Sequence, residues 1–111
     1  ERHQQSIKMF YEAGGKIAMG TDAGTPFNVH GDNCQELQYM ADLGISNSDV
    51  LKISTANAAD LMAMEDRGQI REGAFADMLI VSGNPLEDIS AVADRGNHRS
   101  VVKNGSLVQF N

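Results

Sequence analysis

The stretch KIAMGTDAGTP, residues 16–26, decides how the fold of this sequence is interpreted. Residues Lys16 to Met19 form a short apolar run without alternation, which is typical of a strand buried on both faces of a parallel sheet. Asp22 follows in a turn rich in glycine and proline. In parallel α/β folds the active groups sit at the carboxyl ends of strands, and Asp22 occupies such a place.

The chemistry of this loop has two interpretations at this point. Asp22 can ligate a divalent metal and take a proton from metal-bound water, or it can accept backbone N–H bonds in its own turn. His30 in the same loop can contact substrate or metal, or it can cap the helix region that follows. The sequence contains no H-x-H, HExxH or CxxC pattern, so we expect no complete metal site within this chain.

An amphipathic helix is predicted before the strand, over residues 2–13. Ile7, Phe10 and Tyr11 are spaced as i, i+3 and i+4, so they share one helix face. The glycine pair that follows is a natural end for this helix, because glycine adopts the left-handed cap conformation.

Further helices are predicted after the loop. Asp32 is expected to cap a helix whose inward face carries Leu37 and Met40. Residues 46–48 offer a new cap, and the apolar spacing after them predicts one or two more helices with a bend near residues 55–57. Most methionines fall at expected core positions, and Cys34 is expected to pack in the interior rather than to react.

The last part of the chain is predicted to be mainly β. Residues 78–81 form a second short apolar strand, and Asp77 just before it is expected to anchor a turn or strand start. Residues 100–103 and 106–110 flank an Asn-Gly pair, the strongest short-range signal for a hairpin.

This change of pattern predicts two parts, residues 1–64 and residues 65–111. The first part contains only one strand of the buried type, which needs hydrogen-bonded neighbours on both edges. Each unpaired buried backbone group costs roughly 1–3 kcal/mol. We therefore expect the neighbouring strands to lie upstream of Glu1, in a longer protein; supply by a second copy of the chain is the less favoured alternative.

Composition restricts the classes of partner. The chain of 111 residues has 41% hydrophobic residues and a formal net charge of −6, from 15 acidic and 9 basic residues. It is therefore expected to fold, and its charge argues against nucleic acid or an anionic membrane surface as a partner. A single cysteine excludes an internal disulfide and favours a reducing, cytoplasmic location.

Several linked motifs in a fixed order resemble one enzyme family. They are the GTDAG turn, the HG-x-N loop, the T-x-NAA helix start, the G-x-I-x-x-G-x-x-ADM segment, the GNPL turn and the NG hairpin. Together they closely resemble the C-terminal part of amidohydrolase-superfamily metal hydrolases, nearest to the imidazolonepropionase-like branch with its prolidase-type and carboxypeptidase-type enzymes. The resemblance covers essentially the whole chain.

The resemblance implies an α/β fold that is incomplete by itself. Residues 1–64 would be the last helix–strand–helix part of a (β/α)8 TIM barrel. Residues 65–111 would be the C-terminal strands of a small β-sandwich whose other strands come from the N-terminus of the family's proteins.

The resemblance also implies roles for the loop residues. Asp22 matches the aspartate that ends the eighth barrel strand, binds the metal and acts as general base. Substrate contacts are implied for Gly24, Thr25, His30 and Gly31. The metal would be one or two ions, zinc in the first instance, held mostly by residues outside this segment.

Three functions are therefore compatible with these patterns. The first is the C-terminal part of a metal-dependent amidohydrolase that cleaves an amide or peptide bond, such as that of a dipeptide, with the fragment alone inactive. The second is a non-catalytic binding or structural relative that keeps the fold. The third is a free-standing small domain that assembles by strand exchange, and homo-oligomers are open under each of them.

Overall fold

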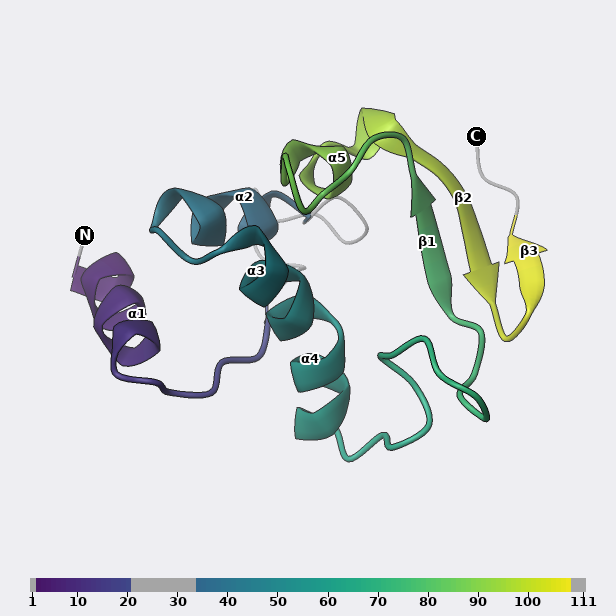
Figure 1. The fold of residues 1–111 in the computed structure, drawn as a ribbon, viewed down its shortest axis with the longest axis horizontal. Helices are drawn as coiled ribbons and strands as arrows, with labels where there is room; N and C mark the ends of the chain where they lie inside the picture. Colours follow the sequence, from purple (N-terminus) through teal and green to yellow (C-terminus); the bar gives the residue numbers. More distant parts are fainter. Residues whose placement is uncertain (1, 21–33, 109–111) are drawn as a thin grey trace, which may run out of the picture.

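The computed structural model describes residues 2–20 and 34–108, and it separates a group of helices from a small sheet (Figure 1). The helices α1 to α4 lie at one side of the molecule and the sheet lies at the other. The elements are α1 (Arg2–Glu12), α2 (Gln35–Asp42), α3 (Asn47–Ser54), α4 (Ala56–Leu61), β1 (Met78–Val81), α5 (Ser90–Ala93), the 3-10 turn η1 (Arg95–Asn97), β2 (His98–Lys103) and β3 (Ser106–Val108).

A local capping signal fixes the start of α3. Ser46 caps α3, because its side chain accepts a hydrogen bond from the Asp49 N–H. The start of α2 differs from the prediction: Cys34, not Asp32, is the residue before the helix. The backbone of Cys34 is already helical and its side chain makes no capping hydrogen bond, while Asp32 lies outside the described residues.

The helical core forms mainly between α2 and α3. Val50 is fully buried, and half-buried Cys34 packs against the same cluster, as predicted. Two residues from the later part of the chain join this core, because α5 packs on α2. The buried cluster consists of Leu37, Met40, Ile45, Val50, Ile53, Ile89 and Ala93.

The segment of residues 16–20 departs from the prediction of a buried strand. It belongs to no strand in the described structure, and Ile17, Ala18 and Met19 are only half-buried. A strand is defined by its pairing, and none of the described strands lies against this segment, since β1, β2 and β3 pair only with one another. Ile17 and Met19 instead pack against the helical core.

The sheet confirms the hairpin prediction. β1, β2 and β3 are antiparallel in the order β1-β2-β3, with Leu79 opposite Val101 and Val102 opposite Leu107. Asn104 and Gly105 join β2 to β3, with φ values of 50° and 82°. Positive φ at both central positions is what a type I′ hairpin turn requires, and this explains the Asn-Gly pair.

Asp77 anchors this hairpin, as predicted. Its Oδ1 accepts a hydrogen bond of 2.8 Å from the Asn104 N–H, and its Oδ2 accepts one of 3.1 Å from Lys103 Nζ. The Asn104 backbone bond is the main cause that lowers the pKa of Asp77, and Lys103 adds to it. The carboxylate before β1 thus fixes the turn between β2 and β3.

A pH dependence of stability follows from the lowered pKa of Asp77. A carboxylate with a depressed pKa stabilises the folded state at pH values above its unfolded-state pKa, which is about 3.9 for Asp. This stabilisation is lost as the pH falls through the folded-state pKa. We expect Asp77→Asn to lower the midpoint of urea unfolding at pH 7. That difference from the wild type should shrink as the pH falls below about 4. A difference that stays constant with pH would show that the Asp77 charge is not what stabilises the hairpin.

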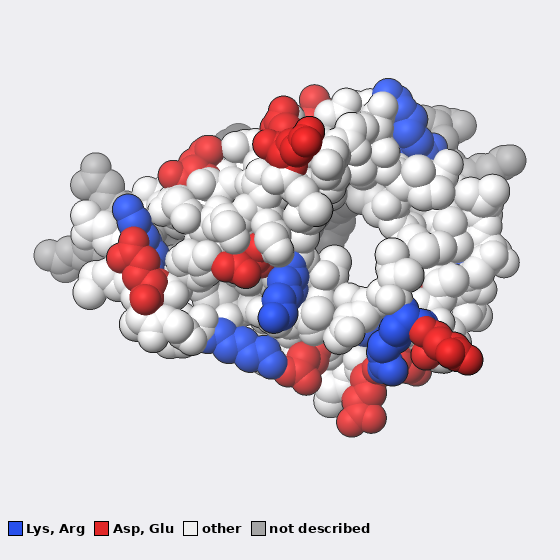
Figure 2. Space-filling view, viewed as in Figure 1, with Lys and Arg blue, Asp and Glu red and all other residues white. Residues whose placement is uncertain are grey.

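Apolar side chains remain exposed on both parts of the molecule. The expectation that most methionines are buried is wrong: Met9 is 69% exposed and Met62 is 66% exposed, because no described element covers their faces. Leu79 and Ile80 on β1 are exposed too. Figure 2 shows acidic and basic side chains interleaved around wide uncharged areas, with the surface hollowed between the helices and the sheet. Within residues 2–20 and 34–108, no helix is both long and apolar enough to cross a lipid bilayer.

Candidate functional site

The residues predicted to carry chemistry fall outside the described part of the chain. They are Asp22, Gly24, Thr25, His30 and Gly31, all within residues 21–33. What the structure describes is the frame that precedes this loop, namely residues 16–20 and the helices that hold them.

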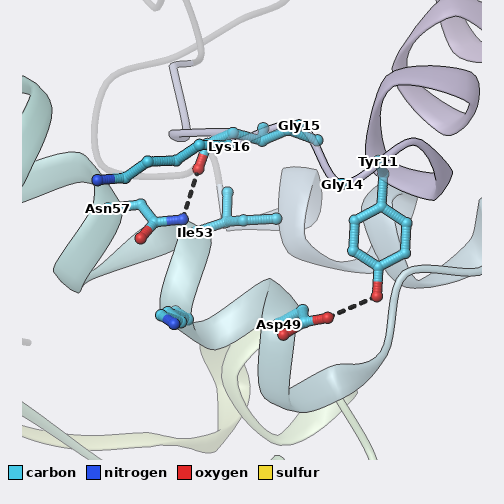
Figure 3. A pocket seen from close by; sticks show the side chains of 9 residues that line it. Tyr11, Gly14, Gly15, Lys16, Asp49, Ile53 and Asn57 are labelled. Atoms are coloured by element: carbon cyan, nitrogen blue, oxygen red, sulfur yellow. Dashed lines mark hydrogen bonds between the residues drawn. The ribbon is translucent and has the colours of Figure 1, made fainter.

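An open cavity of about 580 Å³ lies where α1, the segment 16–20, α3 and α4 meet (Figure 3). Its wall combines polar groups from three separate stretches of the chain. The lining residues are Tyr11, Gly14, Gly15, Lys16, Ile17, Asp49, Lys52, Ile53 and Asn57.

The break between α3 and α4 offers the first contact to the segment. α3 ends at Ser54, and Thr55 has φ −121° and ψ −83°, outside the helical region. The last carbonyls of a helix lack partners within it. The Ile53 carbonyl therefore remains available, and it accepts a hydrogen bond of 3.2 Å from the Met19 N–H.

Asn57 provides the second contact. Its side-chain Nδ2 donates a hydrogen bond of 2.8 Å to the carbonyl oxygen of Ile17, 40 residues earlier in the sequence. Figure 3 shows the Asn57 side chain reaching from its helix to the backbone of the segment that carries Gly15 and Lys16. The bond is partly buried, so less water competes for the carbonyl than at an open surface.

Lys16 provides a third, exposed contact. Its Nζ donates to the carboxylate of Asp60, and the two side chains are 65% and 66% exposed. The hydrogen bond from Lys16, followed by its positive charge, lowers the pKa of Asp60. An ion pair this exposed contributes little to stability.

Tyr11 links α1 to α3 through hydrogen bonds of its hydroxyl group. Its hydroxyl donates to Asp49 Oδ2 at 2.5 Å, and it accepts the Ser46 N–H at 3.5 Å (Figure 3). The helix α1 before the segment and the helix α3 are thereby joined directly.

The described residues do not by themselves form a metal site. No group of three or more His, Cys, Asp or Glu side chains that could hold an ion occurs in residues 2–20 and 34–108. The donor set for the expected metal is thus not among them.

The sequence alone does not indicate the roles of Tyr11 and Asn57. The T-x-NAA motif did single out the stretch that contains Asn57, but only as a helix start. Its side chain in fact caps nothing in its own helix and binds a distant backbone carbonyl. No local pattern indicates a partner 40 residues away.

Comparison with known proteins places the chain in one family. The model of the amidohydrolase family matches residues 1–108. An ochratoxinase from Aspergillus niger is 32% identical over 110 residues, which cover 96% of this chain and 22% of that protein.

Solved structures give the same result. A Xaa-Pro dipeptidase with methionine bound in its active site is 38% identical, with a TM-score of 0.86 over 96% of this chain and 25% of that one. A putative prolidase from Bifidobacterium longum is 28% identical, with a TM-score of 0.87 over 96% of this chain and 26% of that one. The chain therefore spans about a quarter of the length of the proteins that it matches. It has the fold of the corresponding portion of these enzymes, and it belongs to the amidohydrolase family.

Proposed function

We propose that this chain is the C-terminal part of a metal-dependent hydrolase that cleaves an amide or peptide C–N bond. The observation that carries the proposal is the match to a Xaa-Pro dipeptidase, with 38% identity and a TM-score of 0.86 over nearly the whole chain. The substrate class proposed is a dipeptide. The family membership supports the reaction, and the name of this relative supports the substrate.

In the proposed reaction Asp22 is the general base and a metal ligand. Its carboxylate accepts a proton from the water that attacks the substrate carbonyl, and it passes that proton to the leaving nitrogen as the C–N bond breaks. A divalent metal, zinc in the first instance, would lower the pKa of the attacking water when the metal is bound. Gly24, Thr25, His30 and Gly31 are proposed to face the substrate.

The rest of the fold is proposed to lie in the same polypeptide. Residues 16–20 would be the last strand of a (β/α)8 barrel, and residues 65–111 would complete a β-sandwich. Exposed apolar residues on α1 and on β1, such as Phe10 and Leu79, support this view, because such faces need covering.

Activity of the full-length protein tests the proposal. We expect it to hydrolyse a Met-Pro dipeptide. A chelator should lower the rate by at least about tenfold, since the metal supplies the nucleophile at neutral pH, and added zinc should restore the rate. The measurement is release of the free amino acid, with metal content determined in parallel.

The opposite results separate the alternatives. A full-length protein that binds no divalent metal and cleaves no amide supports the non-catalytic relative. A well-folded oligomer formed by residues 1–111 alone supports the free-standing module.

A further inference from the structure

We infer that Asn57 is a positioning residue, which fixes the segment 16–20 against α3 and α4 and so sets where the chain enters the Asp22 loop. The inference rests on the proposed function for its catalytic consequence, but its structural part stands on the contacts alone. Asn57 is inferred to act through the backbone of this segment and not by contact with the substrate.

Contacts with the helices hold the segment 16–20. No described strand pairs with residues 16–20, so their backbone depends on contacts with the helices. The structure gives two backbone anchors, from Met19 N–H to the Ile53 carbonyl and from Asn57 Nδ2 to the Ile17 carbonyl. The two anchors are two residues apart on the segment, and residues i and i+2 of an extended chain face the same side.

Both anchors arise at the break between α3 and α4. The side chains of Ser54 and Thr55 accompany the break, donating to the carbonyls of Val50 and Leu51 at 2.8 and 2.7 Å. Such back-bonding by Ser and Thr bends helices. The bend leaves the Ile53 carbonyl available and directs the first turn of α4, with Asn57, toward the segment.

Asp22, the proposed catalyst, follows the anchored segment closely in the sequence. Only two residues, Gly20 and Thr21, lie between Met19 and Asp22. A shift of the anchored segment is therefore passed along a short stretch of chain to Asp22. Misplacement of a catalytic group by about 1 Å can cost about 100-fold in rate.

Two substitutions at Asn57 separate hydrogen bonding from packing. Asn57→Ala removes the donor, and alanine is the better helix former, so any loss does not come from helix propensity. Asn57→Asp keeps the size and shape but replaces the donor by a carboxylate oxygen that faces the Ile17 carbonyl oxygen. A positioning role predicts that Asp is worse than Ala, whereas a space-filling role predicts that Asp is better than Ala.

Asp60→Asn is the matched control. Asp60 lies one turn further along α4 and contacts the same segment, through Lys16, but at an exposed site. We expect this variant to behave like the wild type within about twofold, as exposed ion pairs contribute little.

The experiment uses the full-length protein and two readouts. Hydrogen exchange of the Met19 amide should quicken about five- to tenfold in Asn57→Ala, as loss of one hydrogen bond of average strength produces, and more in Asn57→Asp. Exchange in α2 should stay unchanged, which shows that the variants are folded. With the dipeptide substrate, kcat should fall by about 10- to 100-fold while KM stays within about twofold.

The outcomes distinguish the two claims. In the first case, the exchange rate of the Met19 amide rises from the wild type to Asn57→Ala to Asn57→Asp, but even the wild type cleaves no amide. The proposed function then fails and the anchoring role stands. If the wild type cleaves amides and Asn57→Asp exchanges and turns over like the wild type, the inference about Asn57 is overturned alone. Because hydrogen exchange is measured without substrate turnover, it tests the anchoring role even in a variant that has lost its activity.

Discussion

Replacing Asp22 by asparagine is expected to lower kcat of the full-length protein by between about 100-fold and 10,000-fold, the contribution of a general base. Asparagine keeps the size of the side chain, but its amide cannot take a proton from water at neutral pH. The proposal also makes Asp22 a metal ligand, so metal content should fall in the same variant. The measurements are steady-state kinetics on the dipeptide substrate and metal analysis of the purified protein.

Asp42→Asn provides the control for this change. Asp42 lies exposed at the end of α2, where it accepts a hydrogen bond of 2.9 Å from Gln38 Nε2. The same chemical change there should leave kcat and metal content unaltered. If Asp22→Asn keeps most of the activity, Asp22 serves its own turn, the alternative that the local sequence leaves open.

Replacing Gly68 by alanine is expected to destabilise the protein by about 3 kcal/mol, for two reasons that add. Gly68 has φ +88°, which costs a side-chain-bearing residue roughly 1–2 kcal/mol. An added Cβ would also lie 2.7 Å from the Cβ of Ala59 and 2.9 Å from the Thr55 carbonyl oxygen, and such overpacking costs about 1–3 kcal/mol. The close approach is to backbone and to a short side chain, neither of which can swing away.

Gly73→Ala carries the first of these costs alone, so its comparison with Gly68→Ala isolates the second. Gly73 has the same φ of +88°, but an added Cβ there meets no atom within 4 Å. We expect this variant to lose only the roughly 1–2 kcal/mol of backbone strain. The comparison is made from urea-unfolding midpoints of the two variants. Equal midpoints would mean that the loop around Gly68 moves away from α4 at little cost.

The G-x-I-x-x-G-x-x-ADM motif thus contains glycines with different physical tasks. Gly68 allows a close approach to the start of α4, while Gly73 serves only a turn. Asp77 in the same motif fixes the β2–β3 turn through Asn104. The motif indicated that this segment belongs to the family, but the distances distinguish which glycine is restricted by packing.

Several elements could be predicted because their causes are local. The Asn104-Gly105 turn, the Ser46 cap and the helix break near Thr55 each follow from the backbone preferences of one to three residues. The family itself was predicted from linked motifs and is confirmed by the match over residues 1–108. The division at residue 64 and the roles of the Asp22 loop stay predictions.

Other features depended on partners far away along the chain. Residues 16–20 have the composition of a strand, but strand formation requires a neighbour, and no described strand pairs with them. The similarity to barrel enzymes supports the prediction that other strands pair with residues 16–20. None of the strands described in this chain does so. For the same reason the exposure of Met9 and Met62 could not be inferred from their helical spacing alone.

Local patterns in the amino-acid sequence indicate where most helices and turns occur, which family the chain belongs to, and which carboxylate is the candidate catalyst. Only the tertiary structure decided that Asn57 binds the Ile17 carbonyl, that Tyr11 binds Asp49, and that Gly68 lies against Thr55. The first set follows from dihedral preferences and from side chains that bond within a few residues of themselves. The second set follows from the packing of whole helices, which brings together groups whose separation in the sequence carries no signal of their contact.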